Sequence, residues 1–487
     1  MSTLALLLPF VAAIIALARA SWFWGLMVFF IYLSIEGLVK LAGNYHPIVH
    51  IGVDVVLWAI VGVWVAKAIL QRRTQLPRVP FFTVLVLHVA WVSLLVFSPY
   101  TASIFVGVAS LKIHLSMIPL YFLGFLFASH VDVPPRFVRA LTIVWCFTFG
   151  LTLVQYVGGP GSLFDFSGPA LSRFSYFHEW RPFGTTALPG GQAVFALLAL
   201  PFALYLVLSG RYRFRDPWIV LTVVGSLAVF FVSGVRQLFL GSFIVVVGMM
   251  GLQIIRGRGR VAGVAVALAS FGTVTYVGVA EYVLPAAQTS LEEATGIPEI
   301  WRRRNPLDRF QTLLEANTYR TARKGGIPLV WDRIKSAPLG VGLGRTGSAA
   351  SALGSTLSDN RFNAQLQEEF GFQDNFFAAM IVETGLPGTL MLTFILLGLG
   401  VRAARLSRRA PTAEDSALGA LVAGYMLALF VMSWGSQPLL GNPTLAFFWF
   451  LGGLVGGRLR QIEDESSAGA EVVPEPTPSP RSPSSFD

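Results

Sequence analysis

The chain has 487 residues, of which 54% are apolar and only 13% are charged, and its mean hydropathy is +0.65. Soluble domains carry about 25% charged residues, so this composition excludes an ordinary soluble protein. Apolar runs long enough to cross the hydrocarbon core recur along the chain, and they are continuous, which excludes an alternating β-barrel pattern. We predict an all-α, polytopic transmembrane helical bundle with a large, partly helical external loop.

Thirteen apolar segments are candidate spans. The first is short, so the predicted number of spans is 12–13. The N-terminal segment lacks the charged region and cleavage site of a signal peptide, which predicts that it is retained as a span. In chain order the segments are 4–18, 22–42, 49–70, 81–97, 102–128, 137–157, 187–208, 217–233, 237–255, 261–284, 375–400, 416–435 and 443–457.

Basic residues are distributed unevenly over the connections between these spans. One alternating set is rich in Arg, whereas intervening connections such as 98–101 and 436–442 carry none. By the positive-inside rule the Arg-rich set is cytoplasmic, which predicts that 158–186 and 285–373 lie outside. Since the cations are scattered singly between helices, the net charge of +10 predicts no nucleic-acid partner. The set contains Arg72, Arg73, Arg78, Arg136, Arg139, Arg211, Arg213, Arg215, Arg256, Arg258, Arg260, Arg402, Arg405, Arg408, Arg409, Arg458 and Arg460.

Composition divides the chain into four parts. Segment 158–186 is rich in Gly, Pro and aromatic residues, and the long loop has apolar residues at helical spacing around 307–336, which predicts a folded cap. The end of the chain is rich in Glu, Pro and Ser, which predicts disorder. The parts are an N-terminal transmembrane bundle (1–284), an external cap (285–373), C-terminal transmembrane helices (374–460) and a disordered cytoplasmic tail (461–487).

Cysteine and histidine usage predicts neither a disulfide nor a metal site. Cys146 is the one thiol of the chain. Of the six His residues only His46 and His50 have a spacing typical of metal ligands, and Pro47 separates them. We therefore expect no metal and no cofactor.

Two arginines stand on the predicted outer side, against the usual charge bias. Arg181 precedes Gly184-Thr185 just before a span, and Arg236 follows Ser233-Gly-Val between two spans. A guanidinium is planar and permanently charged, so it suits bidentate binding of phosphate oxygens. Arginines that reach toward lipid headgroups are the alternative interpretation. The pattern favours binding of a diphosphate-linked lipid.

Polar residues introduce the span that begins near residue 375. Asp374 is the candidate general base, because a carboxylate near cations can stay ionised and accept a proton from a hydroxyl group. Its alternative role is to cap the helix. Asn375 follows it as a candidate substrate ligand. Glu383 is expected either to orient the neighbours of Asp374, to form hydrogen bonds across helices or to line a polar cavity.

The segment Pro338-Leu-Gly-Val-Gly-Leu-Gly344-Arg345 is a Gly-rich turn that ends in a cation. Glycines let a backbone approach a ligand closely, which makes Arg345 a candidate binding residue. The segment lacks the Gly-Lys-Ser/Thr of a nucleotide-binding loop. Lys112 and His114 lie within one span, where we expect them to be paired inside the bundle.

In order and spacing, four segments resemble the O-antigen ligase / O-antigen polymerase superfamily of bacterial inner-membrane glycosyltransferases. The resemblance covers roughly residues 180–400. The segments are Arg181-x-x-Gly184-Thr185, Ser233-x-x-Arg236, Trp331 through Gly344, and Asp374-Asn375 through Gly385-Leu-Pro-Gly388.

The resemblance implies an inverting, metal-independent transferase of the bacterial inner membrane, with its active site facing the periplasm beneath the loop 285–373. The implied donor is a glycan on undecaprenyl diphosphate, whose diphosphate Arg181 and Arg236 would hold. Asp374 stands where the ligases place a His that activates the acceptor. The Asp-Asn form and the spacing of Arg323-Lys324 before Trp331 depart from the ligase pattern.

These departures favour a polymerase of exopolysaccharide, capsule or O-antigen repeat units, with Asp374, Arg181 and Arg236 as catalytic residues. Candidate substrate-binding residues are Gly184, Thr185, Arg345, Asn375 and Glu383. Expected partners are the lipid-linked glycan, membrane lipid, and polysaccharide chain-length or export proteins. An O-antigen ligase is the near alternative, and a flippase or exporter of lipid-linked oligosaccharides is the alternative from another class.

Overall fold

The computed structural model describes most of the predicted spans but only part of the external loop. All regular elements in the described residues are helices, which confirms the all-α prediction. The expected span 261–284, the expected span 4–18 apart from Ile15, and loop residues 285–325 and 347–374 lie outside the described residues. The structure describes residues 15, 19, 21–43, 51–70, 79–101, 103–128, 133–159, 162–163, 181–186, 188, 190–256, 326–346 and 375–471.

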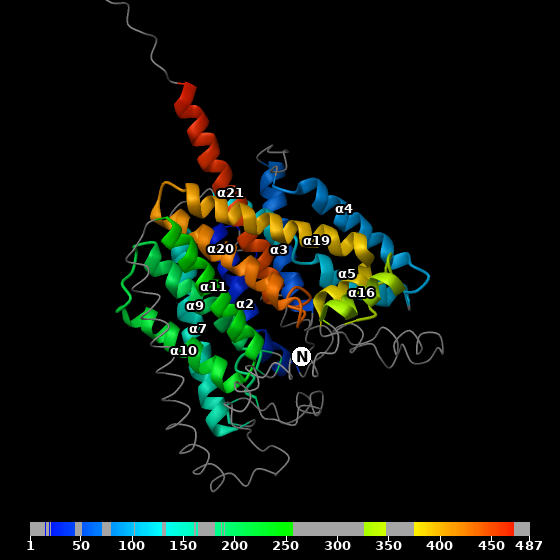
Figure 1. Cartoon of the computed structure of the whole chain (residues 1–487). Coiled ribbons are helices and arrows are strands. Elements are labelled where there is room, and N and C mark those ends of the chain that lie inside the picture. Colours follow the sequence, from blue (N-terminus) through cyan, green and yellow to red (C-terminus); the bar gives the residue numbers. More distant parts are fainter. Residues whose placement is uncertain are drawn as a thin grey trace, which may run out of the picture.

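The helices pack side by side into a bundle (Figure 1). Among the described residues seven helices are long and apolar enough to cross a membrane, and three shorter helices are also apolar. This confirms a polytopic helical bundle. The helices are α2 (Trp22–Ala42), α3 (Gly52–Leu70), α4 (Phe82–Leu94), η2 (Leu95–Phe97), α5 (Ile104–Leu115), α6 (Pro119–Phe127), α7 (Val133–Gly158), α9 (Ala193–Leu208), α10 (Pro217–Ser233), α11 (Arg236–Ile255), α16 (Gly326–Ser336), α19 (Phe376–Arg409), α20 (Ala413–Met432) and α21 (Thr444–Glu471).

Some element boundaries differ from the sequence predictions for local reasons. The expected span 102–128 is divided into α5 and α6 by a turn before Pro119, whose missing N–H suits the first position of a helix. Within the apolar run at 187–208, residues 190–192 form a turn and the helix begins only at Ala193. Helix α19 continues beyond the expected 375–400 to Arg409.

The tail begins later than the sequence predicted. We expected disorder from residue 461, but α21 continues to Glu471. Residues 461–471 contain Glu, Gln and Ala, which favour helix even without an apolar face. Arg460 and Asp464, one turn apart, lie 3.6 Å from each other and add a weak exposed pair. Apolar periodicity was therefore the wrong criterion for this segment.

The core of the bundle is a set of aromatic side chains where α2, α6, α7 and α21 meet. Phe30 packs against Phe447 and Phe450 with ring centroids 4.7 and 5.0 Å apart, and Phe137 packs against Phe450 at 5.2 Å. Trp145 lies beside them, and its indole N–H donates to the Ser34 hydroxyl at 3.0 Å. Because lipid is as apolar as these side chains, close packing and such hydrogen bonds hold the helices together.

Helices α6 and α21 approach each other at glycines. A Cβ at Gly453 would overlap with the carbonyl oxygen of Tyr121 and would lie 2.9 Å from the amide nitrogen of Phe125. Gly457, one turn later, lies in the same way against the Phe125 backbone. Small residues four positions apart are typical of transmembrane helix contacts, because they let two backbones pack directly.

The Arg-rich connections gather at one end of the bundle, hereafter the Arg-rich end. Arg256, which follows α11, donates from Nη1 to the Ser407 carbonyl oxygen of α19 at 3.1 Å. The Arg139 guanidinium of α7 lies 5.4 Å from the ring centroid of Tyr212, in the connection between α9 and α10. These contacts join connections that are far apart in the sequence, as the alternating Arg pattern predicts.

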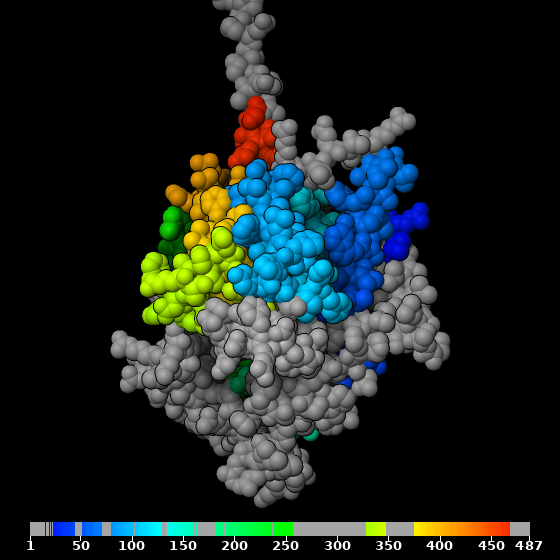
Figure 2. Space-filling model, turned by 90° about the vertical axis from the view of Figure 1, so that its right-hand side faces the viewer, coloured from blue at the N-terminus to red at the C-terminus, as the bar shows by residue number. Residues whose placement is uncertain are grey.

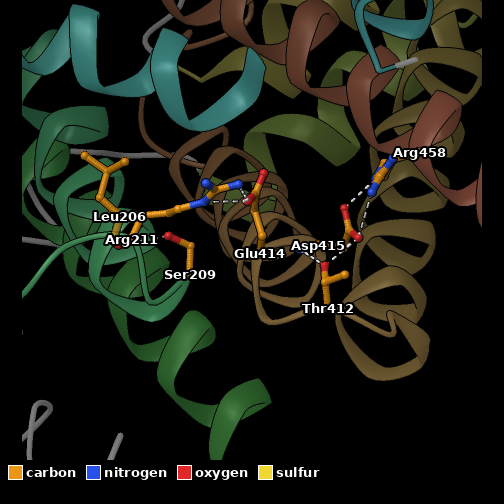
Figure 3. A network of polar contacts seen from close by, with 7 residues as sticks. All are labelled: Leu206, Ser209, Arg211, Thr412, Glu414, Asp415 and Arg458. Atoms are coloured by element: carbon orange, nitrogen blue, oxygen red, sulfur yellow. Dashed lines mark hydrogen bonds and ion pairs between the residues drawn. The ribbon is translucent and has the colours of Figure 1, made fainter. Parts of the chain in front are cut away.

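Figure 3 shows how the start of α20 is fixed at this end. The Thr412 hydroxyl accepts from the Asp415 amide at 3.1 Å and so caps the helix. The Asp415 carboxylate accepts from Nε and Nη2 of Arg458 at 2.5 and 3.0 Å, and Glu414 accepts from Arg211 at 3.1 and 3.2 Å. Two ion pairs therefore connect α20 to α21 and to the connection that follows α9.

Helix α16 is the described part of the predicted cap. It lies at the opposite end of the bundle, where the yellow-green segment 326–346 adjoins the light-blue segment that contains α4 and α5 (Figure 2). Val330 packs against the main core and Trp331 is exposed. The helical part of the cap is thus confirmed for these residues only.

Replacement of Gly453 tests the close crossing of α6 and α21. We expect Gly453→Ala to lower the free energy of unfolding by about 1–3 kcal/mol, because the added methyl group must displace backbone atoms. In Gly62→Ala, at an exposed position of α3 with open space around it, the change should be below about 1 kcal/mol. Thermal unfolding of both variants in detergent micelles measures this difference, and equal effects would contradict the direct backbone contact.

Candidate functional site

The two turns that carry Arg181 and Arg236, both predicted to lie outside, meet at Gly190. An ideal Cβ on Gly190 would lie 3.6 Å from Cδ of Arg181, 3.1 Å from the Ser233 carbonyl oxygen and 3.0 Å from a methyl group of Val235. The two motifs are 52 positions apart in the sequence. The backbone of Arg236 follows directly as the first residue of α11, whereas its side chain lies outside the described residues.

The turn 181–186 is held by buried hydrogen bonds. Gly184 has φ +61°, a conformation that favours glycine, and its amide donates to Oε1 of Gln155 at 2.8 Å. The Thr185 hydroxyl lies 2.6 Å from the Ser34 carbonyl oxygen, to which it donates, and the Thr185 carbonyl accepts from the Gly37 amide at 3.0 Å. Gly184 and Thr185 therefore fix the turn against α2 and α7, and this positions Arg181.

The starts of α11 and α19 are both bound to the turn that follows α20. Gln237 donates from Nε2 to the Gly435 carbonyl oxygen at 2.5 Å. Asn375 donates from Nδ2 to the Trp434 carbonyl oxygen at 3.0 Å, and the next amide, that of Phe376, donates to Ser433 at 3.0 Å. One short turn, 433–436, thus holds the residues that adjoin Arg236 and Asp374.

Asn375, rather than Asp374, caps α19. Its side-chain oxygen accepts from the Ala378 amide at 3.1 Å. The sequence alone left the cap as the alternative role of Asp374, and its neighbour fills that role. Asp374 itself lies outside the described residues.

Glu383 forms a second buried cluster two to three turns further along α19. Its Oε2 lies 2.8 Å from Nε2 of His114 and accepts from the Ser110 hydroxyl at 3.2 Å. Its Oε1 accepts from the amide and the hydroxyl of Thr346, both at 2.8 Å. The side chain is 4% exposed. Of the three roles left open by the sequence, the hydrogen bonds across helices are confirmed.

The expected pairing of Lys112 and His114 is also confirmed, although only His114 is paired in the buried interior. Lys112, whose side chain is 37% exposed, lies 2.7 Å from the Asp54 carboxylate of α3, and His114 contacts Glu383 as described above. Helix α5 is therefore joined to α3 by an ion pair and to α19 by the contact between His114 and Glu383.

Helix α19 is broken at Gly385, and the Gly-rich turn 338–344 is hydrogen-bonded into the break. Gly385 has φ +68°, and Pro387 brings no amide hydrogen. The Val341 amide donates to the Val382 carbonyl oxygen at 2.7 Å, and the Leu386 amide donates to the Pro338 carbonyl oxygen at 2.8 Å. The turn thereby provides partners for backbone groups that the interrupted helix leaves without their usual ones.

Arg345 binds the Gly-rich turn to the connection between α4 and α5. The carbonyl oxygen of Tyr100 accepts from its Nε at 3.0 Å and also from its Nη2. The residue is 1% exposed, and burial lowers the pKa of its guanidinium. In this arrangement Arg345 anchors the turn to the α4–α5 connection, and Glu383 anchors it to α19.

Two polar residues that support the Arg181 turn were not selected from the sequence. Gln155 and Gln192 lie on apolar helices, and Gln192 accepts from the Thr185 hydroxyl at 3.1 Å and donates to Thr148 at 2.7 Å. A glutamine within an otherwise apolar run is the signal that could have identified them, since an amide in a membrane span requires partners. The turn 433–436 shows no such signal, because it interacts through its backbone.

Comparison with known proteins gives no family assignment: no family model matches the chain, and no curated protein matches it. Within the described residues, no group of three or more His, Cys, Asp or Glu side chains could hold a metal ion.

Removal of the Glu383 carboxylate tests the buried cluster. We expect Glu383→Ala to lower the free energy of unfolding by about 3 kcal/mol, because His114 and the Thr346 amide would lose a buried partner. Glu414→Ala is the control, since its partner Arg211 is 49% exposed and such pairs contribute about 1 kcal/mol or less. Thermal unfolding in detergent compares the two, and a loss no larger for Glu383→Ala than for the control would contradict this role.

Proposed function

We propose that the chain is a membrane glycosyltransferase that polymerises undecaprenyl-diphosphate-linked oligosaccharide repeat units into an exopolysaccharide, capsule or O-antigen. One observation carries the proposal. The Arg181 turn, the Arg236 turn and the start of α19 meet through Gly190 and the turn 433–436, at the end of the bundle opposite to the Arg-rich connections.

The positive-inside rule places few cations at that end, so two arginines in adjacent turns there favour an anionic ligand. A lipid diphosphate enters from the bilayer, carries its charge at the depth of the helix ends and presents oxygens that accept bidentate hydrogen bonds. The proposed ligand thus matches the charge of the two arginines and the location of their turns. The positive-inside rule favours a site on the outer side of the membrane, and the resemblance to the O-antigen ligase / O-antigen polymerase superfamily implies that this side is the periplasm of a bacterial inner membrane.

In the proposed reaction a hydroxyl oxygen of the acceptor glycan attacks the anomeric carbon of the donor from the face opposite to the diphosphate. The new C–O bond forms as the bond between the anomeric carbon and the phosphate oxygen breaks, which inverts the configuration. The bonding electron pair leaves with the diphosphate, whose charge Arg181 and Arg236 stabilise. Asp374 accepts the proton of the attacking hydroxyl group.

The position of Asp374 agrees with this role. It immediately precedes Asn375, which both caps α19 and binds the turn 433–436. A carboxylate that is not required as the helix cap is available for proton transfer, and the N-terminal end of a helix stabilises its ionised form.

Polymerisation by purified protein tests the proposal. With undecaprenyl-diphosphate repeat units as the sole substrate in lipid nanodiscs, we expect the wild type to produce a ladder of glycan lengths. Arg181→Ala should lower turnover by about 100-fold or more, because it removes a group that stabilises the departing diphosphate. Asp374→Asn should lower it by about 100-fold, because the amide cannot accept the proton.

Arg215→Ala is the matched control, because it removes an exposed arginine from the Arg-rich end and should keep wild-type turnover. Transfer only after a lipid acceptor is added would indicate an O-antigen ligase with the same donor site. Movement of the intact lipid-linked unit between leaflets, with no glycosidic bond formed, would indicate a flippase and contradict the proposed reaction.

A further inference from the structure

Gln155 is a buried amide that the fold uses only in part. It lies near the end of α7, is 1% exposed, and its Oε1 accepts from the Gly184 amide at 2.8 Å. Its Nε2 is buried and has no hydrogen-bond partner among the described residues. Leaving a buried donor without a partner costs about 1–3 kcal/mol. Such a group at a candidate site calls for an explanation.

The orientation of the Gln155 amide is fixed by the hydrogen bond that its oxygen accepts from Gly184. If the Gln155 side chain were rotated by 180°, its NH₂ group would face the Gly184 N–H, so two donors would oppose each other. The oxygen must therefore face Gly184, and the group left over is a donor. This donor belongs to the same planar amide whose oxygen contacts the Arg181 turn at Gly184, three residues after Arg181.

Gln192 in the same region provides a contrast. It accepts from Thr185 at 3.1 Å and donates to the Thr148 hydroxyl at 2.7 Å, so both halves of its amide have partners within the fold. The fold can therefore provide hydrogen-bond partners for both ends of a buried glutamine amide in this region. The Gln155 amide differs from that of Gln192 in keeping a donor without a partner.

Ser233 is a second buried group of this kind. It is the last residue of α10, its side chain is buried, and its hydroxyl has no partner among the described residues. Its carbonyl oxygen faces Gly190, against which Cδ of Arg181 also lies. Gln155 thus contacts the Arg181 turn at Gly184, and Ser233 adjoins Gly190, whose amide donates to the Pro182 carbonyl oxygen of that turn at 2.9 Å.

We propose that the Gln155 Nε2 group, with the Ser233 hydroxyl, donates hydrogen bonds to a phosphate oxygen of the lipid diphosphate beside Arg181. This inference rests on the proposed function and deepens it, because it assigns a further binding residue to the donor site. Phosphate oxygens only accept hydrogen bonds, and the amide, the hydroxyl and the guanidinium at this turn can all donate. A neutral sugar would need acceptors as well as donors.

Binding of two lipid probes to protein in nanodiscs tests the assignment. The probes are undecaprenyl diphosphate and undecaprenol, which share the chain and differ in the diphosphate. Gln155→Glu retains the acceptor for Gly184 and removes the donor, and Gln155→Met removes both. We expect both variants to bind undecaprenyl diphosphate about tenfold more weakly or worse than the wild type, with undecaprenol binding within about twofold.

Gln253→Met is the matched control. Gln253 is also buried, but it lies near the Arg-rich end of α11 and donates to Ser416 at 3.0 and 3.2 Å. This variant should bind both probes as the wild type does, whatever its thermal stability.

The outcomes separate the two proposals. If the wild type prefers undecaprenyl diphosphate over undecaprenol and Gln155→Glu does the same to the same extent, Gln155 only positions Gly184 and this assignment is wrong, while the donor site stands. If the wild type shows no preference for the diphosphate, the proposed function fails and this assignment fails with it.

Discussion

The break in α19 at Gly385, with the turn 338–344 hydrogen-bonded into it, is the constraint on which this end of the molecule depends. In a membrane, a backbone amide or carbonyl without a partner costs several kcal/mol, so a helix can be interrupted only where other protein groups supply partners. Here Val341 and Pro338 supply them. Glu383 contacts His114 of α5 and accepts from the Thr346 amide, so it connects the end of this turn segment to α5. Arg345 donates to the Tyr100 carbonyl oxygen in the connection between α4 and α5. Part of the predicted external loop is thereby built into the bundle.

The same arrangement makes α19 a fixed support for the candidate site. The helix begins at Asn375, about 12 Å before Glu383 at 1.5 Å per residue. Both points are held by other elements, the first by the turn 433–436 and the second by α5. Gln237 binds the first of these supports from α11. Donor-binding and proton-accepting groups would therefore be positioned by helices, which hold a geometry better than loops do.

Much of the fold could be predicted from the sequence, because span length and Arg distribution are direct consequences of the bilayer. The break in α19 was not predicted, since the expected span 375–400 ran through Gly385-Leu-Pro387 and the turn that pairs with the break lies some forty residues away along the chain. The cap was considered as the alternative role of Asp374 and is filled by Asn375, because both residue types are favoured caps and only the hydrogen bond to Ala378 distinguishes them.

The candidate site was predicted in part. Arg181 and Ser233-x-x-Arg236 were selected for their charge on the outer side, and the structure brings their turns together at Gly190. The Arg345 side chain, selected because it ends a Gly-rich turn, is instead buried against the Tyr100 carbonyl, because such a turn can bind a helix break as readily as a ligand. Gln155 was overlooked, since a neutral amide does not stand out in a search for charges, although its unused donor is the sharper sign of a ligand.

The most direct measurement is a cryo-electron microscopy structure of the protein in nanodiscs with an undecaprenyl-diphosphate-linked repeat unit bound. The account predicts diphosphate density between the Arg181 turn and the Arg236 side chain, with the first sugar directed toward Asp374 at the start of α19. Density for the diphosphate elsewhere, or guanidinium groups of Arg181 and Arg236 that point away from each other and from the headgroup, would contradict it.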